Sequence, residues 1–301
     1  RQESFVRTLR SIGVGLVVVD EAHCVSMWGH DFRPDYLFIR RALDELGSPT
    51  LLGMTATATP GTVAEIAAAL GRDPEVIRTS VVRPNLRYDV EHAANEEERL
   101  RVLVERLQGL DGASAIVYAR SRRSTETLAR VLAGHGLRAA AYHAGLEPDE
   151  RTRVQDGFVH GRVQVVTATT AFGMGIDKPD VRLVALANHP DSLESYVQMV
   201  GRAGRDGLPS DTVLLSGAAD AASLRRFAVA DVPGAEALRA VYRALRDADG
   251  RLDPEQHADA THDPRVLVGM LEQAGLVERG FDEGRLVRVV LPPPPADAAA
   301  R

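Results

Sequence analysis

The feature that most constrains the fold is a series of short apolar runs that end at polar residues. Residues 14–20 (V-G-L-V-V-V-D) and 50–54 (T-L-L-G-M) are the first two, and each is predicted to be a fully buried strand. Similar runs alternate with segments of helical length as far as residue 216. Strands that alternate with helices indicate right-handed βαβ units around parallel sheets. We therefore expect an α/β fold with functional side chains just beyond the strand ends.

A helix is expected at 62–70, and the string R-P-N at 83–85 is interpreted as a linker. A second set of units then begins, with helices at 96–107, 124–135, 147–160 and from 193. Its strands are expected at 114–118, 139–142, 163–167, 181–186 and 211–215. Beyond residue 216 the pattern predicts helices at 218–227, 234–247 and 263–274, then a β-hairpin formed by 275–279 and 285–291. Helices followed by a small hairpin suggest a winged-helix-like module.

These elements divide the chain into five predicted parts. Residues 1–83 form part of a first lobe, and residues 84–217 form a second lobe. A helical bridge at 218–250 and a winged-helix-like domain at 251–291 follow. The tail at 292–301 is rich in Pro and Ala, a composition typical of disorder.

Composition excludes several classes of protein. Cys24 is the only cysteine, so an intrachain disulfide or a multi-cysteine zinc site is impossible, and a reducing, cytoplasmic setting is expected. No run of 18 apolar residues occurs, so no membrane-spanning segment is predicted. The net charge of −6 argues mildly against a nucleic-acid binder, although local patches matter more than the sum.

The first chemical motif is the string D-E-A-H, which ends the run at 14–20. Asp20 is placed to hold Mg²⁺ through water, because this hard cation prefers oxygen ligands. Glu21 is placed to polarise a water that attacks a γ-phosphate. A lone D-E pair also fits a solvated strand end. The apolar run before the pair and His23 after it favour the catalytic interpretation.

The strongest motif is Q-x-x-G-R-A-G-R-D-G at 198–207. Arg202 and Arg205 lie three positions apart on a Gly-rich turn that follows a helix. Two guanidiniums in this arrangement can face one phosphate cluster and stabilise charge in a transition state. Gln198 and Gly201 belong to the same candidate site, and the alternative is an exposed basic turn.

Three further segments follow apolar runs. In 167–177 (T-A-T-T-A-F-G-M-G-I-D) the glycines, Gly175 among them, allow a ligand to approach the backbone. There Thr169 is a candidate phosphate contact, and Asp177 is a candidate for a ribose hydroxyl or a motif arginine. In T-A-T at 55–57, Thr55 and Thr57 can connect the D-E-A-H site to another domain. This string also fits a helix N-cap or a plain strand end.

The third segment, at 24–36 (C-V-S-M-W-G-H-D-F-R-P-D-Y), is rich in aromatic and charged residues. Trp28 and Phe32 offer stacking faces, and His30 and Arg33 offer hydrogen bonds or phosphate contacts. Together with Asp31 they are candidates for coupling nucleic-acid binding to the D-E-A-H site. The alternative is a core loop with a buried Trp.

The order of these strings, together with R-P-N at 83–85, Y-H-A-G-L at 142–146 and A-F-G-M-G-I-D-K-P at 171–179, resembles the RecQ family of superfamily-two DNA helicases over roughly residues 14–227. The resemblance implies two RecA-like lobes that use ATP and Mg²⁺ to move 3′-to-5′ along DNA. It also places Arg120, Ser121, His143 and Thr169 on the side that faces DNA, with Trp28, Phe32 and Arg33 in a DNA-sensing loop. For Ser121 a plain helix N-cap is an equal alternative.

The same resemblance implies single-stranded or duplex-junction DNA as partner, a role in repair or recombination, and a bacterial cytoplasmic enzyme that works as a monomer. Protein partners stay open. No membrane and no zinc are expected, because the family's four-cysteine site cannot form from one cysteine. The acidic winged-helix-like part also fits a protein-docking or lobe-capping role.

One motif of such a motor is missing. A phosphate-binding loop, G-x-x-x-x-G-K-[ST], needs a lysine, and the one lysine, Lys178, lies between Asp177 and Pro179. An N-terminally truncated helicase, inactive as a fragment, is the favoured explanation, and a natural pseudo-motor is the other. The rival functions are an RNA helicase, because of D-E-A-H, and a non-catalytic DNA-binding or strand-annealing protein.

Overall fold

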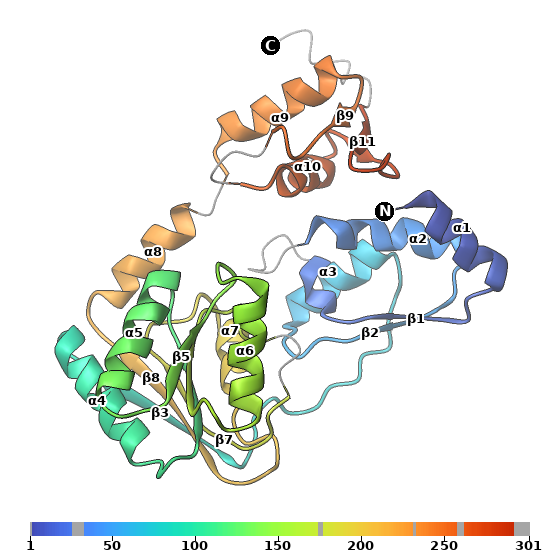
Figure 1. The fold of residues 1–301 in the computed structure, drawn as a ribbon. Helices are drawn as coiled ribbons and strands as arrows, with labels where there is room; N and C mark the ends of the chain where they lie inside the picture. Colours follow the sequence, from blue (N-terminus) through green and yellow to red (C-terminus); the bar gives the residue numbers. More distant parts are fainter. Residues whose placement is uncertain (1, 26–32, 174–176, 231–232, 258–261, 292–301) are drawn as a thin grey trace. The chain divides into compact units, whose positions relative to one another are not determined.

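The structure is a computed structural model that describes residues 2–25, 33–173, 177–230, 233–257 and 262–291 (Figure 1). The chain forms two compact units. One contains Arg78–Ala228, and the other contains Arg1–Ile77 with Val229–Arg301. In the described part of the chain, no helix is long and apolar enough to cross a membrane.

The unit at Arg78–Ala228 is built on one six-stranded sheet. Its strands are β3 (Leu86–His92), β4 (Ser114–Tyr118), β5 (Ala139–Tyr142), β6 (Val165–Ala168), β7 (Val181–Leu186) and β8 (Ser210–Ser216). They lie in the order β3-β8-β7-β4-β6-β5, and every pair is parallel. All five residues of the central strand β4 are buried, as expected for a parallel strand covered on both faces.

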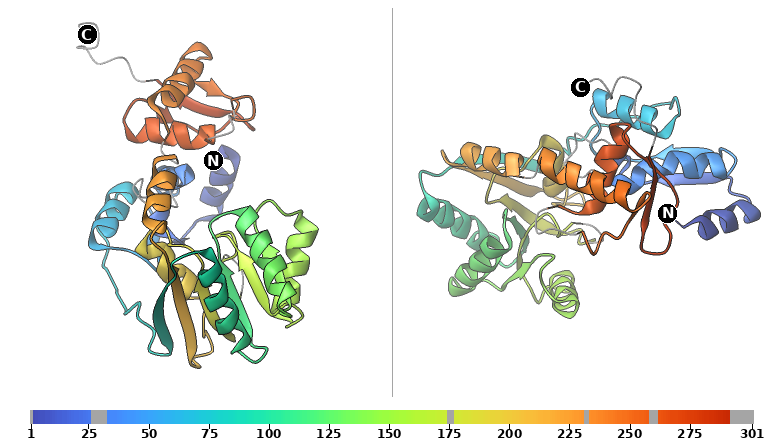
Figure 2. Two further views of the ribbon diagram at one scale, coloured as in Figure 1. Left: turned by 90° about the vertical axis from the view of Figure 1, so that its left-hand side faces the viewer. Right: turned by 90° about the horizontal axis from the view of Figure 1, so that it is seen from above.

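Helices cover both faces of this sheet (Figure 2). Helices α6 (Pro148–Val159) and α7 (Leu193–Val200) pack in one apolar cluster with Ile116, Phe158 and Phe172. Helices α4 (Glu96–Gln108) and α5 (Arg122–Gly134) pack in a second cluster on the other face, with Val117 and Leu183. Helix α8 (Asp220–Ala230) follows β8. The predicted parallel α/β lobe is therefore confirmed, and β3 is a strand that the sequence patterns missed.

The other unit holds a smaller parallel pair. Strand β1 (Leu16–Val19) pairs with β2 (Thr50–Gly53). The pair is accompanied by α1 (Glu3–Ile12), α2 (Phe38–Glu45), α3 (Pro60–Leu70) and two short 3₁₀ turns, η1 (Ala22–Val25) and η2 (Pro34–Leu37). The prediction of fully buried strands is wrong here, since Leu16 and Val18 are 54% and 49% exposed. The described residues supply only two strands to this sheet, and the elements packed on it leave much of these strands exposed.

The C-terminal part of the same unit has a core of its own. Helices α9 (Ala235–Asp247) and α10 (Pro264–Gln273) pack with the three-stranded antiparallel sheet β10-β11-β9. Its strands are β9 (Arg251–Leu252), β10 (Glu278–Arg279) and β11 (Val287–Val290). Leu245 of α9 is fully buried in this cluster. Helix α9, which the sequence assigned to a bridge, thus packs with the predicted hairpin in a small helical and β module.

Candidate nucleotide and DNA sites

The D-E-A-H string forms a sharp turn at the end of β1. The main chain of Met54 bonds to both sides of this turn: Met54 N donates to Val19 O and Met54 O accepts from Ala22 N, both at 2.8 Å. Between them Glu21 has φ +48°, a conformation that is uncommon for a residue with a side chain and is often found at functional sites. Asp20 Oδ1 accepts a bond of 2.9 Å from the Glu21 amide. The turn leaves the Asp20 carboxylate exposed at the strand end.

His23 connects this turn to the T-A-T string. Its Nδ1 lies 2.9 Å from Thr55 Oγ1 and 3.4 Å from Glu21 Oε2. Thr55 Oγ1 also accepts a bond of 3.2 Å from the Thr57 amide. His23 is buried, so loss of a polar contact of its ring would destabilise the fold. The structure therefore brings the predicted catalytic pair, Asp20 and Glu21, together with residues that the sequence assigned to coupling, namely His23, Thr55 and Thr57.

Tyr36 stabilises the turn at the end of β1 through a hydrogen bond to its main chain. This residue was not identified from the sequence. Its hydroxyl donates to Asp20 O at 3.0 Å. Burial is the main cause that raises the pKa of Tyr36, and the neighbouring Cys24 adds to the effect. Arg33 is exposed, and its amide donates to Cys24 O at 3.0 Å. The other predicted members of the DNA-sensing loop lie outside the described residues: Trp28, His30, Asp31 and Phe32.

The second candidate site follows α7, where Gln198 is half-buried on the helix and Gly201 ends it. Arg205 Nη1 lies 3.4 Å from Asp177 Oδ1, which is one of the two contacts proposed for that aspartate. A Cβ at Gly173 would lie 3.3 Å from Arg202 Nη2, so this glycine leaves room for the guanidinium. Gly175 lies outside the described residues.

Both arginines act on one buried ring. The Tyr118 hydroxyl donates to Phe172 O at 2.8 Å. Burial raises the pKa of Tyr118 to about 12, while the positive charges of Arg202 and Arg205 oppose the rise. Both guanidiniums are therefore close enough to influence the Tyr118 hydroxyl, and their convergence on one phosphate cluster stays a prediction.

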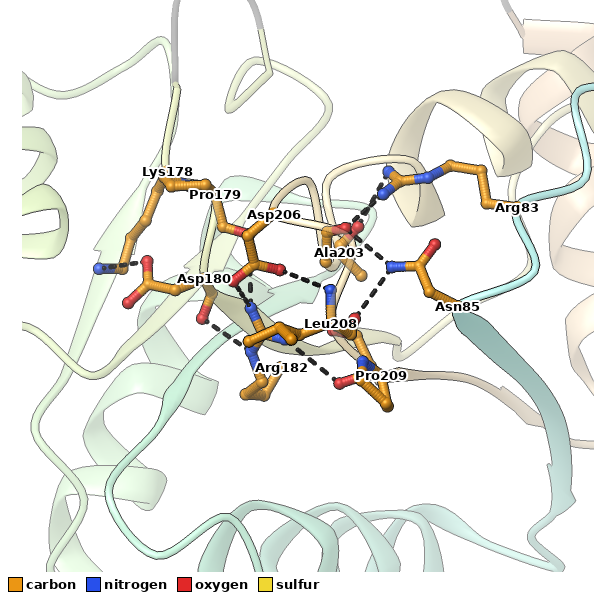
Figure 3. Close-up of polar contacts among 12 residues, drawn as sticks. Arg83, Asn85, Lys178, Pro179, Asp180, Arg182, Ala203, Asp206, Leu208 and Pro209 are labelled. Carbon is orange, nitrogen blue, oxygen red and sulfur yellow. Dashed lines mark hydrogen bonds and ion pairs between the residues drawn. The ribbon is translucent and has the colours of Figure 1, made fainter.

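The arginine-bearing turn is held by residues that the sequence had assigned to a linker. Figure 3 shows Arg83 and Asn85 donating to main-chain carbonyls of this turn, with Arg182 and Asp206 on its other side. The only sequence signal for these residues was the string R-P-N. Its composition does not indicate a contact with residues some 120 positions later.

The predicted DNA-facing residues follow the C-terminal ends of three parallel strands. Ser121 is the N-cap of α5 and accepts a bond of 3.1 Å from the Ser124 amide. Arg120 Nη2 donates to His189 O at 2.7 Å. His143 Nε2 lies 3.0 Å from Glu126 Oε1, and its ring is almost wholly buried. Thr169 is half-buried after β6. The N-cap alternative for Ser121 describes its geometry, and its contact with phosphate stays a prediction.

At the end of β1, the group suited to bind a cation is the Asp20 carboxylate. Asp20 offers an exposed carboxylate, and no group of three or more His, Cys, Asp or Glu that could hold a metal occurs within the described ranges. Mg²⁺ is commonly held by one or two carboxylates, water and phosphates rather than by a protein cage. Asp20 fits that mode of binding.

Comparisons with known proteins identify the class of protein to which this fold is similar. Residues 98–207 match the helicase conserved C-terminal domain. The fold is similar to that of the Mycobacterium smegmatis helicase Lhr bound to ssDNA and AMP-PNP, with a TM-score of 0.59 and 23% identity over 97% of this chain and 43% of that chain. It is also similar to Saccharomyces cerevisiae Dbp5 bound to RNA and ADP BeF3, with a TM-score of 0.57 and 18% identity over 74% and 60% of the two chains. The fold is thus that of helicase motor domains.

Sequence relatives narrow the class. The chain is 38% identical over 245 residues to the probable ATP-dependent DNA helicase RecS of Bacillus subtilis, covering 81% of this chain and 49% of the relative. It is 42% identical over 225 residues to the ATP-dependent DNA helicase RecQ of Pasteurella multocida, covering 74% and 35%. The chain spans at most about half the length of these relatives. It is a homologue of the RecQ-type DNA helicases, and the resemblance predicted from its motifs is confirmed.

Proposed function

We propose that the chain belongs to an ATP-dependent DNA helicase of the RecQ type. The observation that carries the proposal is the connection of two strand-end motifs, in which His23 joins the Asp20–Glu21 turn to Thr55 at 2.9 Å. A shift of the carboxylates on nucleotide binding would move Thr55 and the loop beyond it. This arrangement suits a motor, in which hydrolysis must be reported to a distant binding surface.

Each set of residues has a role in this proposal. Glu21 orients and deprotonates the attacking water, and Asp20 holds Mg²⁺ through water. The cation would neutralise charge on the nucleotide phosphates. Arg202 and Arg205 stabilise the charge that develops in the transition state, with Gln198 beside them on α7. Asp177 holds Arg205 through the contact of 3.4 Å.

The DNA surface in the proposal is the C-terminal edge of the six-stranded sheet. Arg120, Thr169 and the α5 N-terminus at Ser121 supply groups that suit phosphates. His143 supports this edge from within, because its buried ring bonds to Glu126. We further propose that the protein moves 3′-to-5′ on single-stranded or duplex-junction DNA and acts as a monomer. Its proposed role is in DNA repair or recombination in the cytoplasm.

ATP hydrolysis by the protein expressed from its complete reading frame tests the proposal. Hydrolysis should be low without nucleic acid, strongly stimulated by single-stranded DNA, and weakly stimulated by single-stranded RNA. Stimulation by RNA alone would instead support an RNA helicase. A folded protein that binds DNA and never hydrolyses ATP would support the non-catalytic DNA-binding alternative.

A further inference from the structure

The segment between α3 and β3 is largely exposed, but two of its residues are half-buried and hydrogen-bonded to a distant turn. Residues 72–83 contain neither helix nor strand, and Ile77 and Val82 expose 87% and 66% of their surface. Arg83 and Asn85, at the end of the same segment, are half-buried. They lie within hydrogen-bonding reach of a turn more than 110 positions later in the chain.

Arg83 binds three carbonyls of the turn that follows α7. Its Nη1 donates to Gly201 O at 3.2 Å and Ala203 O at 3.0 Å, and its Nη2 donates to Gly204 O. These carbonyls lie beyond Val200, the last residue of α7, and so are outside the hydrogen-bond ladder of the helix. A guanidinium with several donors in a fixed plane satisfies them better than a single ammonium.

Asn85 fastens the same turn at its next residues. Its Nδ2 donates to Gly204 O and to Leu208 O, both at 2.9 Å, and its own carbonyl accepts from the Ser210 amide at 3.0 Å. A Cβ at Gly204 would lie 2.7 Å from Asn85 Nδ2. The turn therefore contacts Asn85 so closely that only glycine fits there.

The far side of the turn is fixed to the start of β7. The Gly204 amide donates to Val181 O at 2.9 Å, and the Asp206 amide donates to Pro179 O at 3.2 Å. The Asp206 carboxylate accepts from Arg182 and from the Leu208 amide. Figure 3 shows the contacts of Asp206 with Arg182 and Leu208 on one side of the turn and those of Arg83 and Asn85 on the other. Arg202 and Arg205 thus project from a turn that is bonded on both sides.

We propose that Arg83 and Asn85 are positioning residues that tie the connecting segment to the turn bearing Arg202 and Arg205. The tie fixes the main chain of the turn and thereby the direction of both guanidiniums. The consequence for catalysis rests on the proposed function, whereas the tie itself can be tested without it.

The tie is tested first by amide hydrogen exchange on the 301-residue chain. In Arg83→Ala the amides of Gly204, Asp206 and Gly207 should exchange about tenfold faster, because local opening becomes easier. Arg78→Ala removes an exposed arginine from the same segment and should leave these amides unchanged. If Arg83→Ala fails to fold, Asn85→Asp keeps the side-chain shape while removing both donors. Unchanged exchange at 204–207 in a folded variant overturns the proposal.

The catalytic consequence is tested in the protein from its complete reading frame. Arg83→Ala should lower kcat for DNA-stimulated ATP hydrolysis by about tenfold or more, since small misplacements of a catalytic group are costly. KM for ATP should stay within about twofold. The affinity for ADP with aluminium fluoride should fall in parallel with kcat. The binding stoichiometry should stay near one, whereas a partly unfolded sample would give a lower value. Arg83→Lys should be intermediate, and Arg78→Ala should match the unaltered protein.

The outcomes separate the two proposals. An unaltered protein that never hydrolyses ATP contradicts the proposed function, and faster exchange in Arg83→Ala would still support the tie. Normal hydrolysis by both the unaltered protein and Arg83→Ala would overturn the positioning role while leaving the proposed function in place.

Discussion

Among single residues, Glu21 is the one whose backbone and side chain point to the same role. Its positive φ turns the chain sharply after β1, and its carboxylate lies 3.4 Å from His23 Nδ1. A strained conformation persists only where its surroundings hold it. Here those surroundings are the Met54 main chain and the Asp20 carboxylate. The turn thus places two carboxylates at one strand end.

Glu21→Gln keeps the size of this side chain but removes the base. In the protein from its complete reading frame, hydrolysis should fall by roughly 10²- to 10⁴-fold, the usual contribution of general acid–base catalysis. Nucleotide affinity, measured by titration calorimetry, should change little. Glu75→Gln, at an exposed position, serves as the matched control. Turnover near the normal rate would exclude Glu21 as the base.

Tyr118 gives a prediction about stability and pH. Its pKa is about 12 in the fold, against an ordinary value of 10.0 for a tyrosine in an unfolded chain. The folded state therefore holds the proton more tightly, and the free energy of unfolding should decrease as pH rises from about 10 to 12. Across that window the loss is about 3 kcal/mol. Denaturant unfolding at several pH values measures it.

Tyr118→Phe should remove this part of the pH dependence, although it also deletes the bond to Phe172 O. Tyr88→Phe changes an exposed tyrosine and should leave the slope in place. A slope that is the same in Tyr118→Phe and the unaltered chain would assign the effect to another group.

At the scale of elements, one buried ion pair joins α4 to the start of α8. Arg99 Nη2 lies 2.7 Å from Asp220 Oδ2, and Arg99 Nη1 donates to Ala187 O at 2.9 Å. Less than a tenth of either side chain is exposed. Asp220 also accepts from the Gly217 amide at 2.7 Å. The pair thus fixes the chain where it leaves β8.

Arg99→Met should strongly destabilise the fold, because it leaves the Asp220 carboxylate buried without its cation. Removing one partner of a buried pair costs about 3–5 kcal/mol. The double variant Arg99→Met with Asp220→Asn should recover most of that loss. Urea unfolding of the single and double variants measures both values. A single-variant loss below about 1 kcal/mol would mean that solvent replaces the pair.

Element prediction succeeded where the pattern was strong. The runs that became β4, β6, β7 and β8 were identified because each contains several consecutive apolar residues, and most residues of these strands are buried. Strand β3 was missed because it is an edge strand without the continuous apolar run by which the other strands were identified. Strands β1 and β2 were identified as strands, but their burial was wrong because burial depends on neighbours that their own residues do not reveal.

At the scale of the whole molecule, Arg78–Ala228 has the features of an independent folding unit. Both apolar clusters that cover its sheet come from residues 86–215. A fragment of residues 78–228 should therefore unfold cooperatively, with a midpoint within about 5 °C of the same transition in the longer chain. Thermal melting followed by circular dichroism tests this, and a broad, non-cooperative melt would show that the unit depends on the rest of the chain.

The sequence by itself determined the strand and helix alternation, the parallel lobe and the motif strings that identify the RecQ relatives. These properties are local, because each depends on neighbouring residues and their periodicity. The tertiary structure decided that His23 meets Thr55, that the ring of His143 is buried against Glu126, and that Arg83 and Asn85 hold the arginine-bearing turn. Such contacts join residues that are 17 to 120 positions apart. They follow from the order of strands in a sheet, which no single stretch of the chain encodes.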